Sequence, residues 1–319
     1  MVVASPDVVA KLRAQVLDPA APIAQRFRTL FSLRNCSGDE AREALEAAMN
    51  DPSALLAHEA AFCLGQMQDE KAVPALQECL KNAQIHAMVR HEAAEALGAI
   101  GSKECLTLLQ ERAIDAAPEV AETCQLALRR IAHKQAESAA STSGDGNSPY
   151  KSVDPAPAAN PNATEAELRA RLLDEGLDLF DRYAAMFALR NRGTPEAVDA
   201  IVDTLTAKSA LLRHEVAYVL GQLQSDRATR ALADTLCDES EHPMVRHEAA
   251  EALGSIADLA SVELLKRFQK HSEPIVSQSC EVALDMLESE QAGEFQYATV
   301  EVDRMNAGSS EQTATIEVC

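Results

Sequence analysis

The sequence predicts an all-α protein, an α-solenoid of eight two-helix repeats in two duplicated halves. The chain matches itself without a gap at an offset of 156 residues, from about residue 12 to residue 130. Within the first copy, a period of 31 to 33 residues separates the helix-end leucines Leu33, Leu64, Leu97 and Leu128. Aromatic residues make up 3% of the chain and Trp is absent, which suits close-packed helices better than a β-sandwich.

Each repeat unit contains two apolar stretches with the 3.6-residue spacing of a helix, separated by short polar turns. Residues 72–80 follow this spacing in one kind of helix, and residues 56–64 follow it in the other. Two-helix units of this length that stack into a superhelix are typical of HEAT and armadillo solenoids. Four such units fit into residues 1–134, which we predict to be an N-terminal HEAT-repeat half.

The second half follows after a segment of different composition. Residues 135–164 are rich in Ser, Ala, Gly and Pro and lack the apolar residues for a core, so they predict a flexible linker that lets the halves face each other. Residues 165–291 predict the C-terminal HEAT-repeat half. Residues 292–319 predict a poorly ordered tail, in which residues 294–302 have the pattern of a short strand-like docking segment.

Charge and cysteine content restrict the class of protein. The 319 residues include 50 acidic and 29 basic ones, and the net charge of −21 disfavours a nucleic-acid or anionic-membrane partner and favours a cationic one. The eight cysteines are scattered without a C-x-x-C motif, as in reduced thiols. We find no signal peptide and no apolar run of roughly 20 residues that would span a bilayer. We therefore expect a cytoplasmic monomer.

One dipeptide occurs at the start of four near-identical apolar segments. The four copies are His58-Glu59, His91-Glu92, His214-Glu215 and His247-Glu248. Their histidines are 33 residues apart within each half and 156 apart between the halves. Because duplication copies a motif, these are two independent observations, both at the same position of consecutive repeats. They predict a metal site assembled by symmetry. The alternative is that His caps or packs the start of each inner helix and Glu stabilises its N-terminal dipole.

The surrounding residues restrict what such a site can be. The zinc-protease motif H-E-x-x-H is absent, since Phe62 and Glu95 stand where the second His would be. Ligands must then converge from neighbouring helices, which pack ~8–10 Å apart. Imidazole and carboxylate donors suit non-haem iron or manganese, and two facing half-sites would form a dinuclear centre. Adjacent residues on a helix point ~100° apart, so the His and Glu of a pair have different roles.

Eight HEAT-like repeats in two halves with four His-Glu pairs resemble the deoxyhypusine hydroxylase family, over about residues 12 to 290. The resemblance implies a di-iron monooxygenase with two Fe²⁺ ions that uses O₂ to hydroxylate deoxyhypusine on the hypusine-bearing translation factor, the last step of hypusine formation. It implies that His58, His91 and Glu92 hold one iron, and that His214, His247 and Glu248 hold the other. Glu59 and Glu215 are implied either as metal-site residues or as carboxylates that bind the cationic substrate chain on a lysine-rich loop.

Other repeated residues have simpler interpretations. His86 and His242 are also related by 156 positions, and we expect them in turns, with a role behind the metal ligands as the alternative. Two other functions stay open for the chain as a whole: a non-enzymatic HEAT scaffold with a peptide-binding surface, and a HEAT-type lyase or chaperone that handles a cofactor. Metal content distinguishes the hydroxylase from both.

Overall fold

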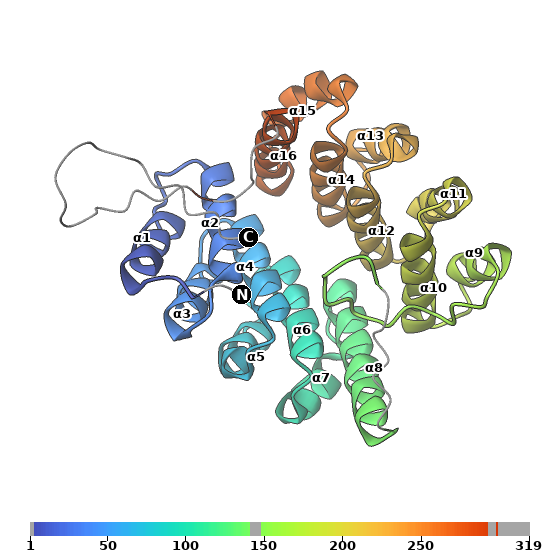
Figure 1. Ribbon diagram of the computed structural model, residues 1–319, viewed down its shortest axis with the longest axis horizontal. Coiled ribbons are helices and arrows are strands. Elements are labelled where there is room, and N and C mark those ends of the chain that lie inside the picture. Colours follow the sequence, from blue (N-terminus) through green and yellow to red (C-terminus); the bar gives the residue numbers. More distant parts are fainter. Residues whose placement is uncertain (1–2, 141–147, 293–297, 299–319) are drawn as a thin grey trace.

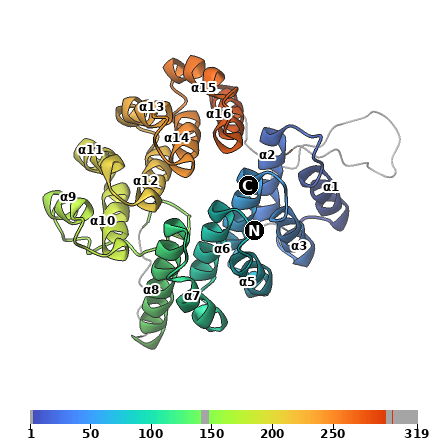
Figure 2. The ribbon, with the colours of Figure 1, turned by 180° about the vertical axis from the view of Figure 1, so that it is seen from behind.

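The computed structural model describes residues 3–140, 148–292 and 298. The described residues form sixteen α-helices in eight consecutive pairs, as the sequence predicts. In every pair the odd-numbered helix lies outside and the even-numbered helix faces the centre (Figure 1; Figure 2). The outer helices are α1 (Pro6–Val16), α3 (Asp39–Ala48), α5 (Val73–Lys81), α7 (Leu106–Arg112), α9 (Glu165–Leu173), α11 (Pro195–Asp203), α13 (Thr229–Cys237) and α15 (Val262–Phe268). The inner helices are α2 (Ile23–Asn35), α4 (Ala54–Met67), α6 (Ala87–Ile100), α8 (Pro118–Ala140), α10 (Leu179–Arg192), α12 (Ala210–Leu223), α14 (Pro243–Ile256) and α16 (Pro274–Ala292).

Local sequence signals fix where the inner helices begin. Ser53 caps α4 by accepting a hydrogen bond from the Leu56 backbone N–H, and Ser209 caps α12 in the equivalent position. His86 and His242 cap α6 and α14, each through Nδ1, which accepts a backbone N–H two residues later at 3.2 Å. These two histidines therefore belong to the turns, as expected.

Glycines set how closely the inner helices stack. A methyl group added to Gly98 on α6 would come within 2.8 Å of the Ala127 Cβ on α8. In the second half, a methyl on Gly254 would meet Ala283 on α16 at 2.7 Å. Since only hydrogen fits at these positions, the backbones of neighbouring inner helices touch, and side chains at matching positions are brought together at the centre.

The two halves close on each other with approximate twofold symmetry. At one junction, Ser209 at the start of α12 donates a hydrogen bond to Glu122 on α8, at 2.6 Å. At the other, Ser53 at the start of α4 donates to Gln278 on α16, at 2.7 Å. These two contacts are related by the 156-residue offset, so the end of each half packs on the beginning of the other. The solenoid therefore forms a closed arrangement around one centre (Figure 1).

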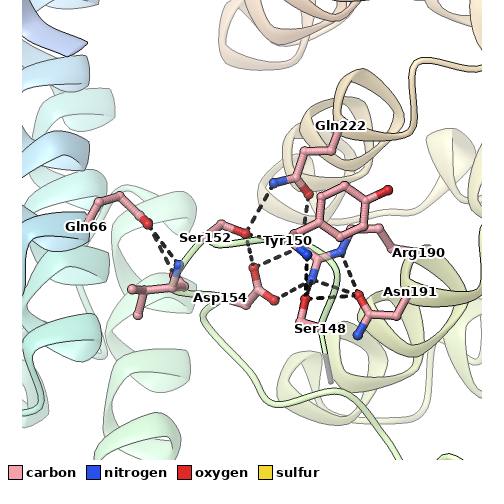
Figure 3. Close-up of polar contacts among 9 residues, drawn as sticks. Gln66, Ser148, Tyr150, Ser152, Asp154, Arg190, Asn191 and Gln222 are labelled. Carbon is pink, nitrogen blue, oxygen red and sulfur yellow. Dashed lines mark hydrogen bonds and ion pairs between the residues drawn. The ribbon is translucent and has the colours of Figure 1, made fainter. Parts of the chain in front are cut away.

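The segment between the halves departs from the expected flexible linker. Helix α8 continues to Ala140, beyond the expected boundary at residue 134. Residues of the segment 148–163 contact α4, α10 and α12 through hydrogen bonds (Figure 3). The Val153 backbone exchanges two hydrogen bonds with the Gln66 side chain on α4, at 2.8 and 3.3 Å. We call residues 148–163 the strap, since they connect the first half to the second by specific contacts.

A buried arginine anchors the strap on the second half. The side chain of Arg190 on α10 has no solvent exposure and pairs with Asp154 of the strap at 2.6 Å. Its guanidinium lies between the rings of Tyr150 and Phe187, 4.4 and 4.7 Å from their centroids, and donates to Gln222 on α12 at 2.9 Å (Figure 3). The sequence did not predict these contacts, because they are polar and join residues that are far apart in the chain.

The expected tail lies largely outside the described residues. Its one described residue after α16, Ala298, donates its backbone N–H to Ser32 on α2 at 2.9 Å. The strand-like pattern of residues 294–302 otherwise falls on residues that the structure does not describe. No helix in the described part of the chain is long and apolar enough to cross a membrane.

Candidate metal centre

The four motif histidines meet at the centre of the ring. Each is the fifth residue of its inner helix, so the repeat places all four at the same depth. Ring centroids lie 5.3 Å apart for His58 and His91, and 5.2 Å apart for His214 and His247. Between the halves, His58 lies 5.5 Å from His247, and His91 lies 5.6 Å from His214. The structure thus brings together the histidines that the sequence singled out.

Each half adds a carboxylate from its second motif. The Glu92 Oε2 atom lies 3.1 Å from His58 Nε2, and the Glu248 Oε2 atom lies 3.4 Å from His214 Nε2. Donor atoms of His58, His91 and Glu92 all lie within 4.8 Å of one another, as a shared metal ion requires. The corresponding carboxylate in the second half lies 4.0 Å from His247 Nε2. A second set of donor atoms within 4.8 Å joins His58 of the first half to His214 and His247 of the second. The described donors thus lie close together both within each half and across the two halves.

The motif histidines do not cap their helices. The N-caps are Ser53, His86, Ser209 and His242 instead. Both ring nitrogens of His58 and His91, and Nε2 of His214 and His247, are buried without a hydrogen-bond partner among the described residues. The close approach of His58 to Glu92 is not aligned as a hydrogen bond. A buried polar atom without a partner costs about 1–3 kcal/mol, so these unpaired nitrogens fit a site built for metal ions.

Burial shapes the protonation of the site. Burial lowers the pKa of His58, and it lowers the pKa of His91 and His247 well below the usual 6.5, with the neighbouring histidines adding to the effect for the latter two. These imidazoles are neutral at pH 7, which is the form that binds a metal. Burial also raises the pKa of Glu59 to about 7 and of Glu92 to about 8. A cation bound beside these carboxyls would favour their ionised form.

The first carboxylates of the motifs lie differently from the second. Glu59 and Glu215 are 9% and 4% exposed, and neither belongs to a set of three donors within 4.8 Å among the described residues. Glu92 and Glu248 also follow a histidine by one residue but belong to such sets, so the two repeats of each half place this carboxyl differently. Phe62 and Tyr218, one turn further along the same helices, face each other at 6.0 Å between ring centroids. These two carboxyls thus lie beside the donor cluster rather than in it.

One donor beside the motif histidines, Glu251, was not expected from the sequence. Glu251 forms a set of donors within 4.8 Å with His247 and Glu248. It follows His247 by four residues, one helical turn, and Glu95 is its counterpart in the first half. A Glu four residues after a motif histidine occurs in both halves, so the sequence did carry a signal for Glu251. In the sequence, Glu95 was considered only as the residue that excludes the zinc-protease motif.

Family models describe the repeats of this chain. Models of HEAT repeats match residues 41–129 and 166–241, and a model of the PBS lyase HEAT-like repeat matches residues 245–271. The matches fall in both halves and leave out the strap. The predicted HEAT solenoid is therefore confirmed.

Whole-chain comparisons give the family. The chain is 58% identical to deoxyhypusine hydroxylase-B of Oryza sativa subsp. japonica over 283 residues, 88% of this chain and 92% of the relative. It is 50% identical to deoxyhypusine hydroxylase of Homo sapiens, over 89% of this chain and 92% of the relative. This chain belongs to the deoxyhypusine hydroxylase family. A solved structure of human deoxyhypusine hydroxylase in complex with glycerol superposes with a TM-score of 0.84 and 48% identity, covering 88% of this chain and 96% of the human one.

Membership in the deoxyhypusine hydroxylase family decides between the functions left open by the sequence. The chain is an enzyme, a deoxyhypusine monooxygenase that acts in hypusine formation. The alternatives of a non-enzymatic scaffold and of a lyase or cofactor chaperone are therefore wrong. The buried His and Glu clusters give this enzyme groups that can hold metal ions.

Proposed function

We propose that the chain holds two iron ions at its centre and uses them with O₂ to hydroxylate the deoxyhypusine side chain of the hypusine-bearing translation factor. The observation that carries the proposal is the set of buried imidazole nitrogens without partners among the described residues, with a carboxylate from each half beside them. Neutral imidazole with carboxylate is a donor set that suits non-haem iron, whereas structural zinc usually recruits thiolates.

Each iron takes its ligands from one half of the chain. His58, His91 and Glu92 hold the first, and His214, His247 and Glu248 hold the second. Two iron ions in such a site supply the activation of O₂ for insertion of oxygen into a C–H bond. The protein contributes fixed ligand positions, which follow from the close stacking of the inner helices, and a buried environment that excludes water from the reacting groups.

Glu59 and Glu215 bind the cationic end of the substrate. Burial raises the pKa of both carboxyls, to about 7 for Glu59 and well above its usual range for Glu215. An ammonium group that enters between them favours their ionised form and forms charge-assisted hydrogen bonds. The position of the two carboxyls beside the donor cluster would hold the substrate chain with its target methylene next to the metal ions.

The charge of the whole chain favours a basic protein substrate. A net charge of −21 attracts a lysine-rich loop over distances up to the Debye length, about 8 Å at physiological ionic strength. The same charge repels nucleic acid and anionic membranes. We propose that the chain works as a cytoplasmic monomer, with O₂ and the substrate protein as its reaction partners.

Two substitutions test the division between metal-binding and substrate-binding residues. His91→Ala removes a ligand, so we expect it to lose iron and activity. Glu59→Ala keeps the donor cluster, so we expect it to retain its iron while KM rises about tenfold to a hundredfold, because a hydrogen bond to a charged group contributes about 1.5–3 kcal/mol. His271→Ala, which removes a histidine paired with Glu239 away from the centre, is the control.

The measurements are iron per chain by elemental analysis and hydroxylation of the deoxyhypusine-bearing protein. Full iron and full activity in His91→Ala would contradict the ligand assignment. Loss of iron in Glu59→Ala with no change in substrate affinity would make Glu59 a metal ligand instead.

A further inference from the structure

The second half contains a chain of three side chains that ends on a motif histidine. Glu251 lies one turn after His247 on α14, and its Oε1 atom is 3.5 Å from His247 Nδ1. Ser279 on the neighbouring helix α16 donates its hydroxyl to the same Glu251 oxygen at 2.9 Å. The opposite ring nitrogen, His247 Nε2, is buried and has no hydrogen-bond partner in the described residues. The ring is thus held from behind, with a free donor atom on its other side.

The first half lacks this arrangement although its sequence is equivalent. Thr123 occupies the position of Ser279, but its hydroxyl donates to the Glu119 carbonyl of its own helix at 2.7 Å. Both ring nitrogens of His91 are without a hydrogen-bond partner in the part of the chain that the structure describes. The Thr123 hydroxyl therefore does not donate a hydrogen bond to Glu95, the counterpart of Glu251, and does not fix the position of that carboxyl.

The two halves differ by one methyl group at this position. The inner helices approach closely in both halves, at Gly98 against the Ala127 Cβ and at Gly254 against the backbone of Ala283. A threonine in a helix has restricted χ1 angles, one of which directs its hydroxyl to the carbonyl four residues earlier. Serine is not β-branched, so its hydroxyl can turn to the neighbouring helix instead.

A metal bound at Nε2 of histidine requires the proton on Nδ1, and a hydrogen bond to that proton fixes both the tautomer and the ring orientation. We propose that Glu251 and Ser279 are positioning residues that pre-orient His247, so that the metal position of the second half binds its ion first and more tightly than the position of the first half. The inference rests on the two-metal site of the proposed function and adds an order of loading to it.

The test uses reciprocal exchanges of the two hydroxyl residues. Ser279→Thr gives the second half the residue of the first, and Thr123→Ser does the reverse. Partners behind a metal ligand typically contribute 10- to 100-fold in affinity. We therefore expect Ser279→Thr to weaken the first step of metal binding about tenfold and to leave the second unchanged, whereas Thr123→Ser strengthens the second step. Ser277→Thr, on the same helix with its hydroxyl on the Pro274 carbonyl, is the matched control.

The probe is Co²⁺, titrated into the metal-free full chain and followed by its visible d–d bands and by metal analysis. Two cations in one centre repel each other, so stepwise binding by itself is expected even for identical positions; the variants decide. Equal effects of Ser279→Thr and Thr123→Ser on both steps, or no effect of either, would overturn the inference. Unchanged thermal stability of the metal-free variants separates a loss of ring orientation from a general loss of packing.

A second variant separates a positioning role from direct ligation. Glu251→Gln keeps an acceptor oxygen for His247, so a positioning role predicts weaker first-step binding with Co²⁺ bands of unchanged shape. Altered bands at the first equivalent would mean that Glu251 is itself a ligand, which would overturn its positioning role. A wild-type chain that binds fewer than two Co²⁺ ions would instead contradict the proposed function and the inference with it.

Discussion

Removing Asp154 should destabilise the protein through a charge that it leaves behind. The side chain of Arg190 is fully buried, and Asp154 provides its carboxylate partner at 2.6 Å with 15% exposure of its own. Breaking a buried pair by deleting one partner costs about 3–5 kcal/mol, because the remaining charge stays out of water. In Asp154→Ala the guanidinium keeps its hydrogen bond to Gln222 and two aromatic faces. We therefore expect the lower end, about 3 kcal/mol.

Thermal and urea unfolding measure this effect. About 3 kcal/mol corresponds to a fall in Tm of about 6–12 °C for a domain of 150–250 residues, the nearest size for which the relation is known. Asp199→Ala is the control, since it breaks an ion pair with Arg227 in which both side chains are about half exposed, 53% and 46%. Such a surface pair contributes little to stability, so we expect no measurable change in Tm.

The double variant Asp154→Ala with Arg190→Met tests the cause. If an unpaired buried charge is responsible, the second substitution removes it and recovers part of the lost stability. A Tm of Asp154→Ala within 2 °C of the wild type would refute the reasoning, because the strap would then contribute no buried ion pair that matters for the fold.

Two further predictions concern packing and protonation. Gly98→Ala should lower the stability by about 1–3 kcal/mol in urea unfolding, because its methyl would overlap Ala127 at 2.8 Å, and wild-type stability would contradict the close stacking. In the metal-free protein, the raised pKa values of Glu59, about 7, and Glu92, about 8, mean that the folded state keeps protons that the unfolded state releases above about pH 4.5. The carboxyls alone would make stability fall as the pH rises. Below pH 6.5, histidines with a lowered pKa, such as His91, have the opposite effect, because they bind protons in the unfolded state only. We therefore expect the Tm with EDTA to fall from pH 6.5 to 8. Bound Co²⁺ ionises the ligand carboxyl Glu92 and should reduce the fall; a Tm that rises with pH in EDTA would contradict the burial of these carboxyls.

The repeat architecture and the cluster of motif histidines could be predicted because both recur in the sequence at fixed intervals. The 156-residue offset places His58 opposite His214, and the 33-residue spacing places His91 beside His58, so that chain topology alone brings the four rings together. Helix geometry did not predict that Glu92 and Glu248 belong to sets of three donors whereas Glu59 and Glu215, at the same position of the motif, do not.

Features that break the symmetry were not predictable. The strap occurs once, and its contacts join Asp154 to Arg190 and Val153 to Gln66 over long distances in sequence. Its Ser- and Pro-rich composition is that of a flexible linker, since polar contacts leave no apolar periodicity. The contrast between Ser279 and Thr123 depends on side-chain rotation, which the aligned halves do not reveal.

The most direct test of the whole account is metal analysis of the freshly purified chain with an absorption spectrum of the same sample. The account predicts about two irons per chain and a visible charge-transfer band. A metal-free chain that cannot be reconstituted with Fe²⁺ would contradict the central claim that the buried imidazole nitrogens are metal ligands.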